Sequence, residues 1–340
     1  MRMKSIIFLA WFLFLMNIVL HTNAQGSLRT EFYGINLTGL ERTWDSPIFN
    51  VRQSKRAIEN LKSNDIKAIR LPIAFQYHFS EDRRFLKKLK NFLAHCSKTE
   101  INLVIAYFGH DLSEENLNQS TDLIIDHWLR VLEILPPRNS NIFLEIVNEP
   151  TISPTSWEKV AVEIISNIRQ KNEGVPLIVG ATNSNSMFEL SRTMPFSFNN
   201  IIYTFHFYEP YIFTHQGTEW TGNQHSTKGI PYPFQEGNMP IINPKAIGTS
   251  GEINFRDYYL TGNRVALEDK ISQISNWAKN YEVELWCTEY GVTINSDVNS
   301  RITYLRDLSE VLKNYRIPGF IWEWEGNFGV NELVDIHVKK

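Results

Sequence analysis

The stretch Ile142-Phe-Leu-Glu-Ile-Val-Asn148-Glu149-Pro150 decides the fold. Its first six residues are mostly β-branched, aromatic or leucine, without strict alternation, which is typical of a strand buried on both faces. Pro150 cannot donate a ladder hydrogen bond, so the strand ends there. We therefore expect Asn148 and Glu149 to lie at the carboxyl end of a parallel sheet that is covered by helices.

Seven further apolar runs have the same character and are separated by amphipathic stretches with helical spacing, among them 85–96, 267–278 and 302–312. Alternating strands and helices predict a parallel sheet, and eight such units predict a single (β/α)₈ TIM barrel of the α/β class. A doubly wound open sheet is the alternative, but no GxGxxG follows the first strand. The other seven runs are Phe32–Leu37, Ile66–Leu71, Asn102–Phe108, Pro176–Gly180, Ile201–Phe205, Val283–Cys287 and Gly319–Trp322.

One connection is much longer than the others. The stretch from Phe207 to Arg264 shows no clear periodicity and is rich in Gly, Pro, Asn, Thr and aromatic residues. A loop of this length in a compact domain is usually functional or disordered, and its aromatic content argues against disorder. It follows the sixth predicted strand, so we expect it on the carboxyl face of the barrel, where active sites lie.

The N-terminus has the features of a signal peptide. Arg2 and Lys4 precede the apolar run Ile6–Leu20, and Ala24 supplies a small residue for cleavage. The run is short for a membrane-spanning helix, which needs about 20 residues. We expect residues 1–24 to be removed and residues 25–340 to form one secreted catalytic domain, extracellular or periplasmic and free of the membrane. An uncleaved anchor is the alternative.

The composition narrows the range of functions. A net charge of −3 gives no electrostatic reason to expect nucleic acid or an anionic membrane as partner. Cys96 and Cys287 lie in a predicted helix and a predicted core strand, so we expect both to be free thiols. No CxxC or HExxH occurs, and we expect neither a metal nor another cofactor. The aromatic content of 13%, with nine Trp, suits the apolar faces of sugar rings. We expect a monomer.

A second strand also ends in a glutamate, in the stretch Val283-Glu-Leu-Trp-Cys-Thr-Glu289-Tyr-Gly291. Strands four and seven face one another across an eight-stranded barrel, so Glu149 and Glu289 can form a pair. Glycoside hydrolysis needs two such carboxyl groups. Taken singly, Glu149 could be an ordinary strand-ending residue and Glu289 part of a salt bridge. Glu145 lies on the same face as Glu149 but deeper, where it needs a partner, and we expect a structural role for it.

At these residues the chain resembles glycoside hydrolase family 5, the cellulase family of the (β/α)₈ clan. The resemblance covers most of the mature chain, and Phe213–Trp220 and Pro231–Pro233 are similar to a loop in some secreted bacterial endoglucanases of the family. The motifs that carry it, in chain order, are Ala68-Ile-Arg70-Leu-Pro72, Asn148-Glu149-Pro150, His206-Phe-Tyr208-Glu-Pro210, Glu289-Tyr-Gly291 and Ile321-Trp322 with Phe328-Gly-Val330.

The resemblance implies a role for each of these side chains. Glu149 would be the acid/base, and Glu289 the nucleophile of a retaining mechanism in which the carboxyl groups lie about 5–5.5 Å apart. Arg70 would keep Glu289 ionised by lowering its pKa by about 1–3 units, and Tyr208 would donate a hydrogen bond to it. The remaining expected roles are a bond to the sugar 2-hydroxyl for Asn148, orientation of neighbouring groups for His206, and the floor under the reacting sugar for Trp322.

The chain departs from the family pattern after the third strand. The family often has a His-His pair there, whereas this chain reads Phe108-Gly-His110-Asp111. We expect His110 to contact the sugar; a loop-stabilising histidine is the alternative. Trp44 and Trp220 are candidate platforms for neighbouring sugars, although tryptophans in loops can equally be packing anchors.

The function expected from the sequence is a secreted endo-β-1,4-glucanase acting on cellulose or a related β-glucan. A β-mannanase, a xyloglucanase or a mixed-linkage β-glucanase would use the same scaffold and the same catalytic residues. A non-catalytic carbohydrate-binding barrel belongs to another class, but such a protein is expected to have lost one of the two carboxylates. A transport or adhesion protein held by the N-terminal segment is disfavoured by the small residues before Gln25.

Overall fold

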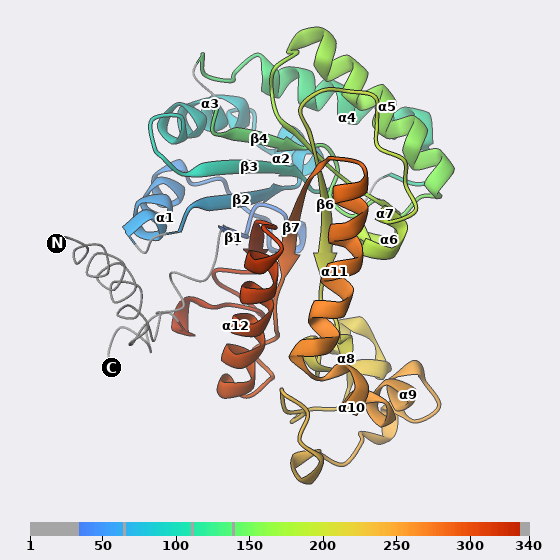
Figure 1. Ribbon diagram of the computed structural model, residues 1–340. Helices are drawn as coiled ribbons and strands as arrows, with labels where there is room; N and C mark the ends of the chain where they lie inside the picture. Colours follow the sequence, from blue (N-terminus) through green and yellow to red (C-terminus); the bar gives the residue numbers. More distant parts are fainter. Residues whose placement is uncertain (1–33, 64–65, 110–111, 138–139, 334–340) are drawn as a thin grey trace, which may run out of the picture.

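The protein folds into a closed barrel of eight parallel strands in chain order, with helices around it (Figure 1). The structure, a computed structural model, describes residues 34–63, 66–109, 112–137 and 140–333. The predicted (β/α)₈ fold is confirmed. The predicted signal peptide and His110 lie outside the described residues.

Each strand coincides with one of the eight apolar runs, and the pairing of β1 with β8 closes the ring through Gly34 and Ile35 opposite Phe320 and Ile321. The bounds are β1 Gly34–Asn36, β2 Ala68–Ile73, β3 Asn102–Tyr107, β4 Ile142–Glu145, β5 Leu177–Gly180, β6 Ile201–Phe207, β7 Glu284–Tyr290 and β8 Gly319–Ile321.

The main helices follow the strands and pack their apolar faces on the outside of the barrel. Most of the apolar positions that predicted the helix at 85–96 are buried, as expected for one face turned toward the strands. These helices are α1 Val51–Ser63, α2 Phe75–Glu81, α3 Phe85–Cys96, α4 Leu117–Leu132, α5 Pro154–Lys171, α11 Arg264–Asn280 and α12 Val298–Asn314, with the short α6 Thr182–Asn185 and α7 Met187–Leu190 after β5.

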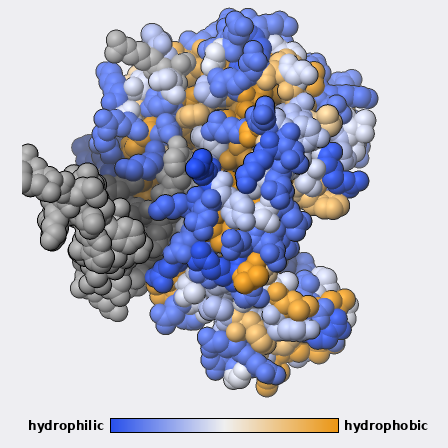
Figure 2. Space-filling model, in the orientation of Figure 1, coloured by the Kyte–Doolittle hydropathy of each residue, from blue (hydrophilic) through white to orange (hydrophobic). Residues whose placement is uncertain are grey.

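The long connection between β6 and α11 is ordered and built from short helical segments. It extends beyond the end of β6 in Figure 1. Apolar side chains are exposed on it, including Ile241, Ile247 and Leu260, and apolar surface gathers in the same part of Figure 2. Its segments are α8 Tyr211–Thr214, η3 Glu219–Thr221, η4 Asn223–His225, η5 Glu236–Asn238, η6 Pro244–Ala246, α9 Ser250–Arg256 and α10 Tyr258–Thr261.

The inside of the barrel is layered. Its apolar layer consists of Ala68, Val104, Ile178, Ile202, Trp286 and Phe320. Two residues along from members of this layer, on the same faces of their strands, lie the buried polar side chains Arg70, Thr204 and Thr288. The barrel is therefore a packed core that becomes polar toward its carboxyl end, where the site lies.

One further prediction can be compared with the described residues. Cys96 and Cys287 are both free and buried, as expected. Among the helices that the structure describes, none is long and apolar enough to cross a membrane.

Candidate active site

Glu149 lies at the carboxyl end of β4, where the chain turns sharply. The ladder continues past the last assigned residue of β4, because the Ile146 amide donates to Ile178 O at 3.1 Å and the Asn148 amide to Tyr107 O at 2.8 Å. Glu149 then adopts a left-handed φ of 48°, which is uncommon for a residue with a Cβ. Such conformations concentrate at functional sites, and this one, together with Pro150, ends the strand at the rim.

Glu289 reaches the same rim from β7 through a shift in register. Phe205 of β6 lies opposite Cys287, but His206 lies opposite Glu289, so β7 has one extra residue at this point. Bulges of this kind redirect side chains and occur next to active sites. A Cβ on Gly291 would lie 2.1 Å from Trp322 O, so only glycine allows the ends of β7 and β8 to approach this closely.

The two glutamates face one another in different surroundings. One carboxylate oxygen of Glu149 and one of Glu289 lie within 4.8 Å of each other. The Glu149 side chain is 33% exposed and the Glu289 side chain 6%. One carboxyl group is therefore open to the solvent and the other is held inside the protein.

Arg70 is the centre of the buried network beneath the pair. Its Nε and Nη2 donate to the two oxygens of Glu145, at 2.6 and 2.8 Å. Its Nη1 donates to Asn36 Oδ1 at 2.8 Å and to Glu289 Oε1 at 2.6 Å. Its Nη2 also donates to Asn148 Oδ1 at 2.6 Å. These five bonds match the five N–H donors of a guanidinium group.

Tyr208 and His206 complete the contacts of the glutamate pair. The Tyr208 hydroxyl donates to Glu289 Oε2 at 2.9 Å. His206 Nδ1 lies 2.7 Å from Glu149 Oε1 and 3.5 Å from Glu289 Oε2, so the ring bridges the two carboxyl groups. Its Nε2 lies 3.1 Å from Asn185 Nδ2 and 3.2 Å from Thr288 Oγ1.

The pKa of Glu289 is set by more than its cation. Burial of the carboxyl group raises this pKa, and the charges of His206 and Arg70, which lower it, offset only part of the rise. For His206, burial alone would lower the pKa, but Glu289 and Glu149 outweigh it and raise the pKa overall. Arg70 divides its charge between Glu145 and Glu289, which limits its effect on either.

The glutamates open into a cavity of about 850 Å³ that crosses the carboxyl face. Trp44, Trp220 and Trp322 all line it, and the first two are 70% and 67% exposed. The Trp322 ring is stacked on Phe108, with centroids 6.4 Å apart. The remaining lining residues are Glu41, Arg42, Asp45, Ser184, Tyr211, His215, Thr221, Glu323, Gly326, Asn327 and Phe328, with Glu149, Tyr208 and Glu289.

Several residues of this region were not identified from the sequence. Asn36 fixes Arg70 and also donates to Thr288 O at 3.0 Å, and Asn185 contacts His206. At one end of the cavity Arg42 forms ion pairs with Glu41 and Glu323. Single polar residues of this kind give no local sequence signal, because most of their partners, all but Glu41, are tens to hundreds of residues away.

Glu149, His206 and Glu289 are also the one group among the described residues whose ligand atoms lie close enough together to hold a metal ion. A cation at that point would lie beside the guanidinium of Arg70, which is bonded to Glu289. The same atoms are already engaged by hydrogen bonds. The arrangement is explained as a pair of carboxyl groups with a shared histidine, and we assign no metal to it.

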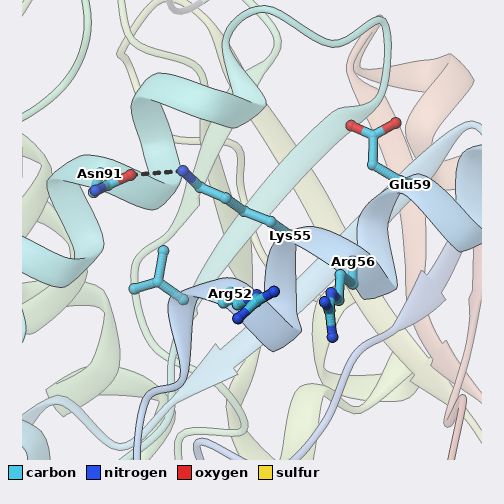
Figure 3. Close-up of a pocket in the computed structure, with 6 residues that line it drawn as sticks. Arg52, Lys55, Arg56, Glu59 and Asn91 are labelled. Atoms are coloured by element: carbon cyan, nitrogen blue, oxygen red, sulfur yellow. Dashed lines mark hydrogen bonds between the residues drawn. The ribbon is translucent and has the colours of Figure 1, made fainter.

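A second hollow, between α1 and α3, lies apart from this chemistry (Figure 3). It is lined mainly by charged side chains of α1, and Lys55 donates to Asn91 Oδ1 at 2.6 Å. None of its residues lines the cavity that contains the glutamates. The carboxylate pair therefore marks the other cavity as the candidate active site.

Comparison with known families agrees with the barrel. The family model for cellulase (glycosyl hydrolase family 5) matches residues 28–328. The chain belongs to glycosyl hydrolase family 5. The residues matched include both glutamates and each of the strands that surround them.

The curated relatives of this chain include proteins named endoglucanases. Endoglucanase C of Acetivibrio thermocellus is 26% identical over 86% of this chain and 90% of its own length. Endoglucanase 3 of Fibrobacter succinogenes is 26% identical over 88% of this chain, which spans only 50% of the length of that relative.

Solved structures of family 5 members have the same fold. A hyperthermophilic endo-β-1,4-glucanase in complex with substrate aligns with a TM-score of 0.72 at 21% identity, over 89% of this chain and 94% of that one. Endoglucanase Cel5A of Thermotoga maritima aligns with a TM-score of 0.71 at 21% identity, over 89% and 92%. At these identities the structural comparison shows the barrel fold alone and says nothing of the substrate of this protein.

Proposed function

We propose that this protein is a secreted, retaining endo-β-1,4-glucanase in which Glu289 is the nucleophile and Glu149 the acid/base. The observation that carries the proposal is the pair of carboxyl groups within 4.8 Å at the barrel rim, each with its own partners. Retaining glycosidases have carboxyl groups about 5–5.5 Å apart, whereas inverting enzymes leave about 6.5–9.5 Å for a water molecule. The short separation supports retention.

The partners of each glutamate support its role in the first step. Glu289 accepts hydrogen bonds from Arg70 and Tyr208, which favour the anion that attacks the anomeric carbon. Glu149, at the open side of the pair, gives its proton to the glycosidic oxygen as the bond to the leaving sugar breaks. The product of this step is an ester between the Glu289 carboxylate and the sugar, together with a free hydroxyl on the leaving chain.

In the second step the roles of the two residues reverse. Glu149, now a carboxylate, takes a proton from a water molecule whose oxygen attacks the anomeric carbon. The ester breaks, Glu289 leaves as a carboxylate, and Glu149 is again protonated, so that two inversions give net retention. His206, bonded to Glu149 in a buried position, orients that carboxyl group for both proton transfers.

Two observations support the proposed substrate: the aromatic lining of the cavity and the names of relatives. Trp44, Trp220 and Trp322 line one long cavity, and flat aromatic rings suit the apolar faces of successive sugars in a polymer. The names of the relatives, endoglucanases, support a glucan cut at internal β-1,4 bonds as the substrate of this protein. β-Mannan is the next candidate, because a structure of the Thermotoga maritima relative is described in complex with mannotriose; xyloglucan and mixed-linkage β-glucan are the others.

The decisive experiment is hydrolysis of a polysaccharide panel by the wild type, Glu149→Gln and Glu289→Gln. Each substitution removes a reacting group and should lower kcat by orders of magnitude, with the folded state retained by circular dichroism. Proton NMR of the first product formed should show the β-anomer. Near-full activity of either variant would reject the assignment of that residue, and activity on mannan alone would reject the glucanase proposal.

A non-catalytic carbohydrate-binding barrel is the competing function from another class. It predicts that the wild type binds β-glucan without releasing reducing ends. The presence of both glutamates together with Arg70 and Tyr208 favours an enzyme, since a binding protein has no use for a buried nucleophile held by a cation.

Secretion is a separate part of the proposal and is supported by the basic, apolar and small-residue pattern of residues 1–24. Expression with the native N-terminus should give a mature protein beginning at Gln25, found outside the inner membrane and monomeric by size-exclusion chromatography. N-terminal sequencing that begins at Met1 would reject the cleavage.

A further inference from the structure

The buried ion pair between Arg70 and Glu145 has a consequence for the site above it. Both side chains are completely inaccessible to solvent, and Glu145 accepts from Arg70 with both oxygens, at 2.6 and 2.8 Å. Such a bidentate pair fixes the guanidinium plane as well as its position. Glu145 lies on β4 and Arg70 on β2, with β3 between them.

Stability alone is a weak explanation for this pair. Removing two charges from water costs about as much as their attraction returns, and well-packed apolar residues often replace such pairs without loss of stability. The neighbouring positions of the barrel interior, including Val104 and Ile178, are already apolar. A buried carboxylate at residue 145 therefore calls for a second reason.

The geometry supplies that reason, because the same guanidinium serves two residues of the site. With Nε and one Nη2 donor held by Glu145, the Nη1 donors point to Asn36 and Glu289, and the other Nη2 donor points to Asn148 Oδ1. The bond from Arg70 to Oδ1 fixes which way the Asn148 amide is turned, and its Nδ2 donors remain for a sugar hydroxyl. The guanidinium group of Arg70 thus sets the orientation of both Glu289 and Asn148.

The positive charge of Arg70 is also shared between two carboxylates. Arg70 carries one positive charge, and two buried carboxylates are bonded to it, Glu145 by two hydrogen bonds and Glu289 by one. A carboxylate that faces an unshared guanidinium is a weaker nucleophile, because the cation stabilises the anion that must react. Sharing with Glu145 leaves Glu289 oriented by Arg70 without the full effect of its charge.

We propose that Glu145 is a positioning residue of the active site, which acts through Arg70 to orient Glu289 and Asn148 and to moderate the charge that Glu289 experiences. The inference rests on the proposed function, in which Glu289 is the nucleophile. It replaces the purely structural role that the sequence suggested for Glu145.

A substitution of Glu145 alone leaves the chemical identity of the other charged and titratable groups around Glu289 unchanged. These groups come from several elements of the barrel and its loops. They are Arg70 of β2, Glu149 after β4, His206 of β6, Tyr208 after β6, Tyr211 of α8 and Cys287 of β7. Burial raises the pKa of Glu289 and Arg70 lowers it. Loss of the Glu145 charge strengthens the second effect alone.

The test is Glu145→Gln in the full chain, with kcat/KM on soluble hydroxyethylcellulose measured across the acid limb of the pH profile. The amide keeps the size of the carboxyl group but turns an N–H toward an N–H of Arg70. We expect kcat to fall at least tenfold and the acid limb to move to lower pH by about one unit, because the unshared cation lowers the pKa of Glu289.

The matched control is Asp297→Ala, which removes the N-cap of α12 away from the cavity. It should lower the midpoint of urea unfolding and leave the acid limb unchanged. A Glu145→Gln variant that, like this control, is only less stable, with the acid limb in its wild-type position, would overturn the proposal.

Glu145→Asp keeps the proposal testable if the Gln variant does not fold. It retains the charge but shortens the side chain, so we expect kcat to fall several-fold with the acid limb where it is in the wild type. An Asp variant with wild-type kcat, or with a limb displaced to lower pH, would contradict the proposal. A wild type that hydrolyses no β-glucan, or an active Glu289→Gln variant, would instead reject the proposed function.

Discussion

Glu289 is held by a different group at each of its oxygens. Arg70 donates to Oε1 and Tyr208 to Oε2, both from positions that are themselves buried. The carboxyl group therefore cannot rotate without breaking a bond to a charged or a hydroxyl donor. Orientation of a nucleophile before the substrate arrives lowers the entropy that the reaction step must lose.

Tyr208→Phe tests this arrangement at the scale of a single hydroxyl. A hydrogen bond to a charged group contributes about 1.5–3 kcal/mol, so we expect kcat/KM to fall roughly tenfold to a hundredfold. The bond lowers the pKa of Glu289, so its loss raises that pKa, and the acid limb should move to higher pH, opposite to the Glu145→Gln shift. A pH–rate profile measures both effects.

The control for this prediction lies on β6, the strand that Tyr208 directly follows. Tyr203 of β6 is buried outside the site, and its hydroxyl accepts from the Phe196 amide at 2.6 Å. Tyr203→Phe should reduce stability and leave the pH profile unchanged. If the Tyr208 variant behaved in the same way, its hydroxyl would have no part in orienting the nucleophile.

At this scale the sequence predicted which residues would be in contact. It predicted less well how these residues would change one another's pKa values. The contacts of Glu289 with Arg70 and Tyr208 were expected and are present. The larger effect of burial, which raises the pKa of Glu289, was not expected, because burial depends on the packing of the whole barrel. The bonds of Asn36 and Asn185 also depend on the fold, since each joins residues that no local pattern relates.

Among the elements, the connection between β6 and α11 contributes one wall of the cavity. It brings Tyr211, His215 and Trp220 to the rim, where the buried ring of His215 lies edge-on to Trp220 with centroids 5.7 Å apart. Burial lowers the pKa of His215 to about 3, so this side chain is neutral and acts through its ring. The connection thus forms a wall of the cavity that rests on a packed base.

Trp220→Ala tests that surface. Loss of an exposed stacking platform should raise KM for a soluble β-glucan roughly twofold to tenfold and leave kcat close to the wild-type value. Tyr259→Ala, an exposed aromatic in the same connection but outside the cavity, is the control and should leave both constants unchanged. Equal KM values for the two variants would contradict the role of Trp220.

The helices are held by their own ends as well as by the barrel. Asp297 caps α12 by accepting from the Asn299 and Ser300 amides at 2.9 and 3.0 Å. Asp297→Ala should lower the free energy of unfolding by about 1 kcal/mol in urea, whereas Asp297→Asn, which can still cap, should lower it less. Equal losses in the two variants would contradict the capping role.

The same cap has a predictable dependence on pH. Partial burial would raise the pKa of Asp297, but the hydrogen bonds from Ser300 and Asn299 outweigh it and lower the pKa. A lowered pKa stabilises the folded state above the ordinary aspartate value of about 3.9, and this contribution is lost as the pH falls through the folded pKa. The difference in unfolding free energy between wild type and Asp297→Ala should therefore shrink on acidification.

The elements themselves were largely readable in the sequence, and their ends were less so. All eight apolar runs are strands, but β7 continues from the predicted end at Cys287 to Tyr290, and β6 continues to Phe207. Both extensions follow the shift in register between these strands, which a single strand's pattern cannot contain. The short helices between β6 and α11 show no periodicity because each is too short to repeat.

For the molecule as a whole, the order of the runs was sufficient to predict the barrel. Eight buried strands separated by helices have few other solutions, and closure then places the ends of β4 and β7 across the same opening. The cavity was harder to predict, since its walls come from the loops after six different strands. Trp44 and Trp220 were identified from the sequence only as candidates and Trp322 through the family resemblance, and all three line it.

Closure of the ring has one more consequence, which concerns neighbouring molecules. In the part of the chain that the structure describes, each of the eight strands is paired on both sides. An open sheet presents an edge whose free N–H and C=O groups can template addition of a strand from another chain, the first step of many aggregates. The folded barrel has no such template, so self-association through strand addition would first require the ring to open.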